Sequence, residues 1–168
     1  MTTASIPAIS MKEMLDWDQE ASAYWKSHLD ANPALLDLPC GIGSAATVQE
    51  FVRHIWGVEL RWAQRLAGIP QIPKEDIPAG PVDALYELHT QAAQILGDLL
   101  ADPAQNWEAT LPLDIPQLPE AARSPSRRKV LGHALLHSQR HWAQLATLVR
   151  VAGFPSGFRG DLLASSAL

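Results

Sequence analysis

The sequence predicts an all-α protein, a four-helix bundle in which a single domain takes up residues 1–168. Apolar residues recur at helical spacing in long segments, and each segment is bounded by residues that start or stop helices. Strand-like alternation is weak, and no Asn-Gly or Asp-Gly hairpin turn occurs. The length of 168 residues suits one domain, and the 47% of hydrophobic residues can form its core.

The first two predicted helices begin at capping boxes, in which a Ser or Thr and a Glu three residues later satisfy free backbone amides. Ser10 and Glu13 have this spacing before the first helix, and Thr47 and Glu50 have it before the second. The two helices cover about residues 11–31 and 48–67, and stop signals follow at Asn32-Pro33 and Gly68-Ile69-Pro70.

The third predicted helix follows Pro81, which suits a first helical turn because the nitrogen there needs no hydrogen-bond partner. Ser124 or Ser126 caps the fourth. A loop with closely spaced prolines connects the two helices, and we expect it to pack across the bundle. The two helices cover about residues 82–101 and 127–152, and they end at Asp102-Pro103 and Gly153-Phe154-Pro155. Long helices with short to moderate connections favour a bundle.

The charge argues against nucleic acid as a partner. The net charge is −5 and the pI is about 5.6, whereas phosphate backbones require a concentrated basic surface. Basic residues cluster once, in a segment that we expect to be a solvated turn rather than a binding patch: Arg123, Arg127, Arg128 and Lys129.

Cys40 is the only cysteine, so the chain has no intramolecular disulfide, and the residue lies outside any Cys-x-x-Cys pattern. The N-terminal residues lack the basic start and apolar run of a signal peptide. No run of about 18 apolar residues occurs, so we expect no membrane span and a cytoplasmic protein.

Three histidines in the fourth predicted helix carry the main chemical signal. His133, His137 and His141 are each four residues apart, so successive rings lie nearly above one another on the helix. Two imidazoles at this spacing can direct ring nitrogens to one metal ion. A third ligand must come from another helix, and His54, which borders the apolar stripe of the second helix, is the best candidate.

The other histidines have ordinary interpretations. We expect His28 to lie at the surface, where it complements the helix dipole, and His89 to be a partly buried residue without a special role. His133 extends the column of the pair, but it is too far from His141 to share its ion. We therefore expect it to form part of the pocket wall.

Two segments resemble the DinB/YfiT-like superfamily. One runs from Leu131 to Gln144 (LGHALLHSQRHWAQ), and the other runs from His54 to Trp62 (HIWGVELRW). The similarity extends over nearly the whole chain in helix order and spacing. It implies a four-helix bundle with up-down-down-up order. It also implies a divalent metal held by one histidine of the second helix and a histidine pair of the fourth, here His54, His137 and His141.

The resemblance also implies roles around this metal. His133 matches a frequent histidine before the pair, and Gln144 matches a polar position just after it. Glu59 is a candidate for orienting a metal ligand or lining the pocket. The alternative is that it is a solvated residue on its helix. Many relatives have a basic residue directly after the second histidine of the pair, where this chain has Trp142.

Three neutral imidazoles leave a coordination position open, which is typical of catalytic rather than structural metal sites. Some relatives are thiol-dependent transferases or isomerases that use bacillithiol, mycothiol or glutathione. The resemblance thus implies a small-molecule substrate, a low-molecular-weight thiol as cosubstrate, and often a homodimer. Nickel or zinc is the expected ion, with iron and manganese as alternatives. We expect some of the six tryptophans to form an exposed apolar patch.

Two alternatives to a transferase remain open at this stage. One is a non-enzymatic, stress-associated module with a structural or regulatory metal, and the other is a plain bundle with a polar pocket and no metal. A zinc protease of the His-Glu-x-x-His type is excluded, because Ser138 stands where that motif has its glutamate. The acidic pI gives no support to a role in DNA repair.

Overall fold

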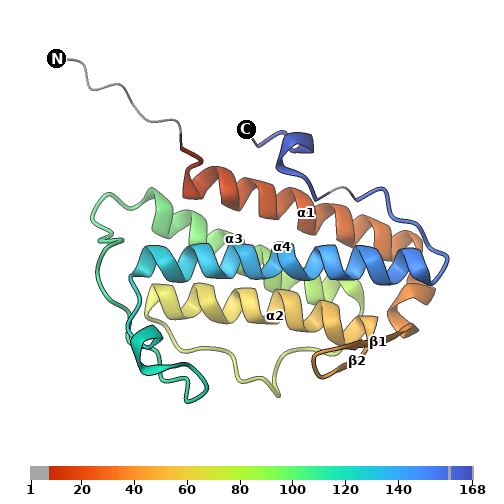
Figure 1. Ribbon diagram of the computed structural model, residues 1–168, viewed down its shortest axis with the longest axis horizontal. Coiled ribbons are helices and arrows are strands. Elements are labelled where there is room, and N and C mark those ends of the chain that lie inside the picture. The colour runs from red at the N-terminus through yellow and green to blue at the C-terminus, as the bar shows by residue number, and fades with distance from the viewer. Residues whose placement is uncertain (1–7, 159, 168) are drawn as a thin grey trace.

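The computed structural model describes residues 8–158 and 160–167 (Figure 1). Its long helices lie close to the predicted ranges, and α4 ends one residue earlier than expected. They are α1 (Met11–Ala31), α2 (Val48–Ala67), α3 (Val82–Ala101) and α4 (Arg127–Val151). Short 3-10 turns follow α1, precede α4 and lie near the C-terminus: η1 (Pro33–Asp37), η2 (Glu120–Ala122) and η3 (Leu162–Ala164).

The four helices form one bundle in which α2 packs against both α3 and α4, and α1 packs against the same two helices from the other side. α1 and α4 run in one direction along the bundle, and α2 and α3 run in the other (Figure 1). The direction along the chain is therefore up, down, down, up. The long loop between α2 and α3 makes this order feasible, since it returns the chain to the end of the bundle where α2 began.

A small antiparallel hairpin precedes α2, which the prediction of a purely helical fold did not include. It consists of β1 (Pro39–Ile42) and β2 (Ala45–Thr47), joined by Gly43 and Ser44. Gly43 has a φ of +60°, a conformation that suits glycine in tight hairpin turns. The two-residue turn Gly43-Ser44 is itself a hairpin signal, but the strands beside it are too short to show clear alternation, and the sequence analysis missed them.

The predicted helix caps are largely present. Ser10 and Glu13 form the complete capping box at α1. At α2 only half of the box forms: Thr47 accepts a hydrogen bond from the Glu50 amide, but the Glu50 carboxylate accepts from Ala46 instead of Thr47. At α4 the capping side chain is Ser126, whose hydroxyl accepts from the backbone of the first turn.

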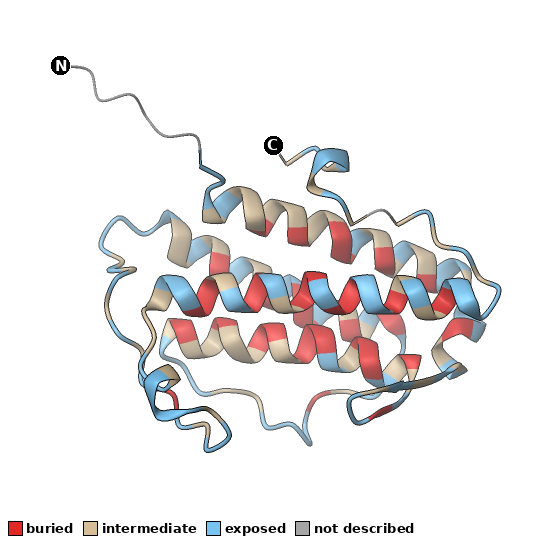
Figure 2. Cartoon of the chain, in the orientation of Figure 1, coloured by how far each residue is buried: buried red, intermediate tan, exposed pale blue. Residues whose placement is uncertain are grey.

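Three tryptophans form the centre of the core. The ring of Trp142 stacks on that of Trp25 at 5.7 Å and meets that of Trp56 edge-on at 5.5 Å, and all three are fully buried. Figure 2 shows buried residues on all four helices. None of the six tryptophans is exposed, so the expectation that they form an exposed apolar patch is wrong.

The basic residues of the predicted cluster form hydrogen bonds and an ion pair around the start of α4. Arg127 donates to the carbonyl of Leu66, Arg128 pairs with Glu108 at 2.7 Å, and Arg123 donates to carbonyls of its own loop. Arg127, Arg128 and Lys129 lie in the first turn of α4 rather than in a solvated turn, and Arg127 and Arg128 bind other parts of the chain rather than form a free basic patch. None of the helices in the described ranges combines the length and apolar character needed to cross a bilayer.

Candidate metal centre and its cavity

His54 of α2 lies beside His137 and His141 of α4. Nitrogen atoms of the three rings all lie within 4.8 Å of one another. The ring centroids are 5.3 Å apart for His54 and His137, 5.2 Å for His54 and His141, and 4.3 Å for the pair on α4. The four-residue spacing puts the pair on one face of α4, and α2 packs beside that helix. The structure thus brings the three predicted ligands together.

The geometry fits a shared metal ion. Nε2 of His137 lies 3.1 Å from Nε2 of His141. Two nitrogens that each lie about 2.0–2.1 Å from a tetrahedral ion are about 3.3–3.4 Å apart. The pair therefore has nearly the separation that an ion requires, and His54 supplies a third nitrogen from the neighbouring helix.

Two neighbours select the tautomer of His141. The amide Oε1 of Gln144 can only accept, so its 2.6 Å contact requires a proton on His141 Nδ1. The guanidinium of Arg140 can only donate, and its Nη2 lies 3.3 Å from His141 Nε2, so that nitrogen carries the lone pair. Both contacts favour the neutral ring with its Nε2 lone pair directed into the group, which is the form that binds a metal.

The surroundings keep the histidines neutral. Burial, and after it the adjacent His141 and His54, which oppose another positive charge, lower the pKa of His137 to about 3. Burial also lowers the pKa values of His54 and His141. The pKa of His54 is lowered first by burial and then by His141. The positive charges of Lys74 and Arg140 lower it further. Neutral imidazoles are required for metal ligation, so the site is prepared for it.

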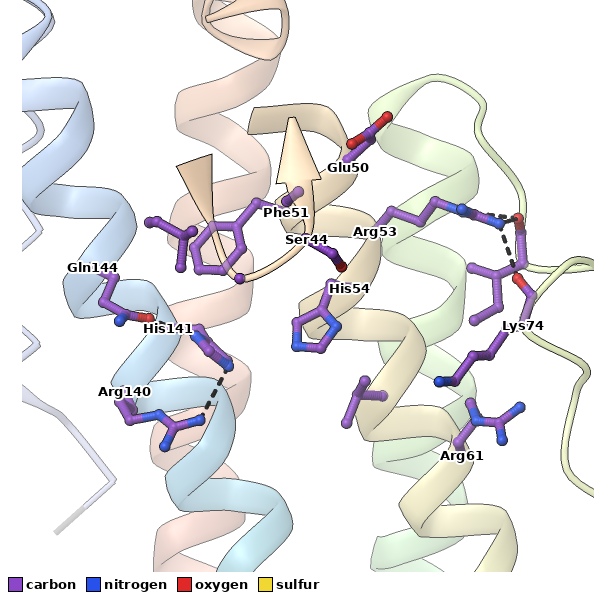
Figure 3. Close-up of a pocket in the computed structure, with 15 residues that line it drawn as sticks. Ser44, Glu50, Phe51, Arg53, His54, Arg61, Lys74, Arg140, His141 and Gln144 are labelled. Carbon is purple, nitrogen blue, oxygen red and sulfur yellow. Dashed lines mark hydrogen bonds between the residues drawn. The ribbon is translucent and has the colours of Figure 1, made fainter. Parts of the chain in front are cut away.

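A cavity of about 640 Å³ opens beside His54 and His141 (Figure 3). Its walls come from α2, α4, the hairpin and the loop between α2 and α3. The volume lies in the usual range for small-molecule sites, roughly 300–1,000 Å³. An ion held by the three histidines would therefore face a space that a small molecule can enter.

The remaining predicted residues differ in position. His133 is exposed, and its ring lies 5.3 Å from that of Trp62 and 5.9 Å from that of His137, so it borders the group. Gln144 contacts His141 and lines the cavity. Glu59 is buried in the bundle core, where it contacts His89 rather than any of the three histidines.

Trp142, which directly follows His141, does not reach the cavity. Its ring is packed in the core against other tryptophans, on the opposite side of α4 from the cavity lining. A basic side chain nevertheless reaches the site from two residues earlier, because Arg140 lines the cavity beside His141. Sequence comparison at position 142 alone could not have found it.

A second group of potential ligands lies inside the bundle. Asp18 of α1, Glu59 of α2 and His89 of α3 are fully buried, and one donor atom of each lies within 4.8 Å of the others. His89 Nδ1 lies 3.1 Å from both carboxylate oxygens of Glu59, and Gln139 of α4 donates to Asp18 Oδ1 at 3.5 Å. The other oxygen of Asp18 has no hydrogen-bond partner among the described residues.

The expectation that His89 is an ordinary partly buried residue is therefore wrong. Asp18 was not predicted at all, although a signal exists: it continues the helical stripe of Leu15, Ala21 and Trp25, where a charged residue points into the core. Burial raises the pKa of Glu59 to about 8 and raises that of Asp18 strongly, so protons can neutralise this group without a metal.

The two groups differ in access and charge. The histidine group borders a cavity of about 640 Å³ and contains only neutral ligands. The core group is buried, borders a smaller pocket of about 300 Å³ only at His89, and contains two carboxyl groups that favour protonation. We therefore regard the histidine group as the candidate functional centre.

The comparison with known protein families gives a match over most of the chain. The model of the DinB family matches residues 12–158, which includes all four helices and all three histidines of the candidate centre. The comparison with curated proteins found no match.

Proposed function

Because the chain belongs to the DinB family, we propose that it is a divalent-metal-dependent transferase that uses a low-molecular-weight thiol. The observation that carries the proposal is the convergence of His54, His137 and His141 at the wall of an open cavity. A set of three imidazoles favours nickel or zinc and also accepts iron, while manganese prefers oxygen ligands.

A divalent ion in such a site lowers the pKa of a bound thiol or water and so supplies a nucleophile near neutral pH. The residues of the chain prepare the site for this chemistry. Gln144 holds the His141 ring through Nδ1, and Phe51 packs edge-on against the same ring at 5.1 Å between centroids. These contacts limit rotation of the ring, so its free nitrogen stays directed at the centre.

A thiol nucleophile at this cavity must come from outside the chain, because Cys40 is the only cysteine. Cys40 is half-buried, burial raises the pKa of its thiol, and it does not line the cavity beside the histidines. Ser138 is buried and donates to the carbonyl of Ala134, so it cannot act as a nucleophile at the cavity either. A small thiol that enters the cavity satisfies this requirement.

The test is metal-dependent conjugation of a thiol to a simple electrophile. Chelator-treated protein is reloaded with Ni²⁺ or Zn²⁺ and mixed with 1-chloro-2,4-dinitrobenzene and, in separate assays, glutathione, bacillithiol or mycothiol. The thiol sulfur bonds to the ring carbon, chloride leaves, and the thiol proton passes to solvent. We expect the loaded protein to accelerate the reaction with at least one thiol.

Matched histidine variants identify the centre. His137→Ala should lose both the metal and the acceleration, because two imidazoles hold a divalent ion far more weakly than three. His28→Gln, at the end of α1 where the ring stacks on Tyr24, should retain both. A protein that holds its ion firmly but conjugates none of the thiols would contradict the transferase and favour a non-enzymatic metal-binding or interaction module.

A further inference from the structure

The cavity beside the histidines is strongly cationic. Its lining contains one acidic side chain, Glu50, and four permanently or normally charged basic ones: Arg53, Arg61, Lys74 and Arg140. This local excess contrasts with the net charge of −5 of the whole chain. The basic residues are therefore gathered at this place rather than spread over the surface.

Two of the four cations stabilise the loop between α2 and α3. Arg53 donates to the backbone carbonyls of Lys74, Ile77 and Pro78 at 2.5–3.1 Å. Arg61 donates to the carbonyl of Ile72. These hydrogen bonds fix the loop that forms one wall of the cavity, so the structure itself explains why both arginines are there.

The other two cations have no such explanation. Lys74 has neither an ion pair nor a side-chain hydrogen bond within residues 8–158 and 160–167, and it is exposed. Arg140 has one hydrogen bond, at 3.3 Å to His141 Nε2, the nitrogen that would bind the metal. Figure 3 shows their side chains on opposite sides of the cavity.

Glu50 does not neutralise these two charges. Its carboxylate accepts from the Ala46 amide at 2.7 Å at the start of α2, and it makes no ion pair with Lys74 or Arg140. The cavity thus presents two basic side chains that are free to bind another group, next to a centre that would itself add positive charge.

We propose that this cavity binds a small molecule that carries a carboxylate or phosphate group, and that Lys74 and Arg140 hold that group beside the three histidines. This proposal rests on the proposed function. It states the chemical class either of the substrate that reacts with the thiol or of the thiol itself. Arg140 can form a forked pair with an anion once an ion takes its place at His141.

The cavity volume of about 640 Å³ limits the ligand to a small molecule. A polymeric anion would need a basic surface extending well beyond one cavity, and the remaining charged groups of this acidic chain do not provide it. Charge and volume together therefore indicate a metabolite-sized anion.

The experiment measures anion binding by isothermal titration calorimetry at low salt, with succinate and inorganic phosphate as probes and neutral succinamide as the control ligand. Both chelator-treated and Zn²⁺-loaded protein are titrated. We expect at least one anion to bind, succinamide not to bind, and added salt to weaken the binding. Lys74→Gln and Arg140→Gln should each weaken it about tenfold, since each removes a charged hydrogen-bond donor.

Arg150→Gln is the matched control, because Arg150 lies exposed near the end of the same helix and away from the cavity. Its anion affinity should equal that of the unchanged protein. Absence of binding to both anions, or equal binding by the doubly substituted Lys74→Gln, Arg140→Gln protein, would overturn the proposal and show that the two side chains are only solvated.

Metal content, measured on every variant, separates this proposal from the proposed function. Anion binding that persists in chelator-treated protein while thiol conjugation fails would leave the cavity assignment intact and reject the transferase. Metal binding and thiol conjugation that both survive in the doubly substituted protein, with unchanged anion affinity, would reject the cavity assignment alone.

Discussion

His141 donates its Nδ1 proton to the amide oxygen of Gln144 at 2.6 Å, one helical turn further along α4. This contact links the second ligand of the histidine pair to a side chain that also lines the cavity. It fixes both the tautomer and the direction of the ring, which is how residues behind a ligand commonly tune a metal site.

Removal of this acceptor should weaken metal binding. We expect Gln144→Leu to lower the affinity for Zn²⁺ or Ni²⁺ roughly 10- to 100-fold, because the His141 ring loses the group that orients it. Competition with a chromophoric chelator measures the affinity. Gln144→Glu is the control, since a carboxylate keeps an acceptor at this position, and its affinity should match or exceed that of the unchanged protein. Equal affinities for all three proteins would contradict this role of Gln144.

Metal binding should persist in mildly acidic solution. Protons compete with a metal for imidazole nitrogens, and burial lowers the pKa of all three ligands below the ordinary 6.5, that of His137 to about 3. Each ring therefore gains a proton at a lower pH than a free histidine does. We expect half of the bound metal to be released only below pH 6.5, as measured by elemental analysis after dialysis at graded pH.

The helices could be predicted from the sequence because their signals are local. The box of Ser10 and Glu13 and the positive-φ stop at Gly68 depend only on neighbouring residues, and the structure has both. The hairpin before α2 was missed, because its turn signal, Gly43-Ser44, is flanked by strands too short to show alternation. Local patterns determine helices far more strongly than such hairpins.

The candidate site was predictable only in part. The four-residue spacing of His137 and His141 places them on one face of a helix, whatever the fold. His54 was the best candidate because it borders the apolar stripe of its helix. That its helix lies beside the fourth is not contained in the spacing, and the family resemblance supplied it. The position of Lys74 depends on how the loop before α3 folds back, and that of Arg140 depends on which side of α4 faces the cavity, so no pattern indicated them.

The core group makes a prediction about stability and pH. Glu59 has its pKa raised from 4.5 to about 8 in the folded protein, so folding favours its protonated form. A raised pKa contributes stability that is complete below about pH 4.5 and is lost as the pH rises to about 8. His89 acts in the opposite sense, since burial lowers its pKa and its contribution is lost as the pH falls below 6.5.

Glu59→Gln isolates the first effect, because glutamine is neutral at every pH and can still accept from His89 and donate to Asp18. We expect its free energy of unfolding, relative to that of the unchanged protein, to increase between pH 4.5 and 8, by an amount on the order of 3 kcal/mol. Urea unfolding at several pH values measures it. The variant should also keep its metal, whereas a loss of metal would place the ion in the core group. If the difference in unfolding free energy between the two proteins does not change with pH, protonation of Glu59 does not stabilise the fold.

The loop that carries Lys74 rests on a glycine of α2. A Cβ at Gly57 would lie 2.9 Å from Cδ1 and 3.2 Å from Cγ2 of Ile77, whereas a Cβ at Gly97 of α3 would meet nothing within 4 Å.

Both glycines are inside helices, so alanine should gain about 0.5–1 kcal/mol of helix stability at each. We expect Gly97→Ala to show this gain in urea unfolding. Gly57→Ala should lose it and destabilise instead, by roughly 1–3 kcal/mol, because Ile77 must move. The same shift should weaken succinate binding, since it displaces the wall of the cavity. If both substitutions stabilise the protein equally, Ile77 and its loop can move away from the added methyl group without loss of stability.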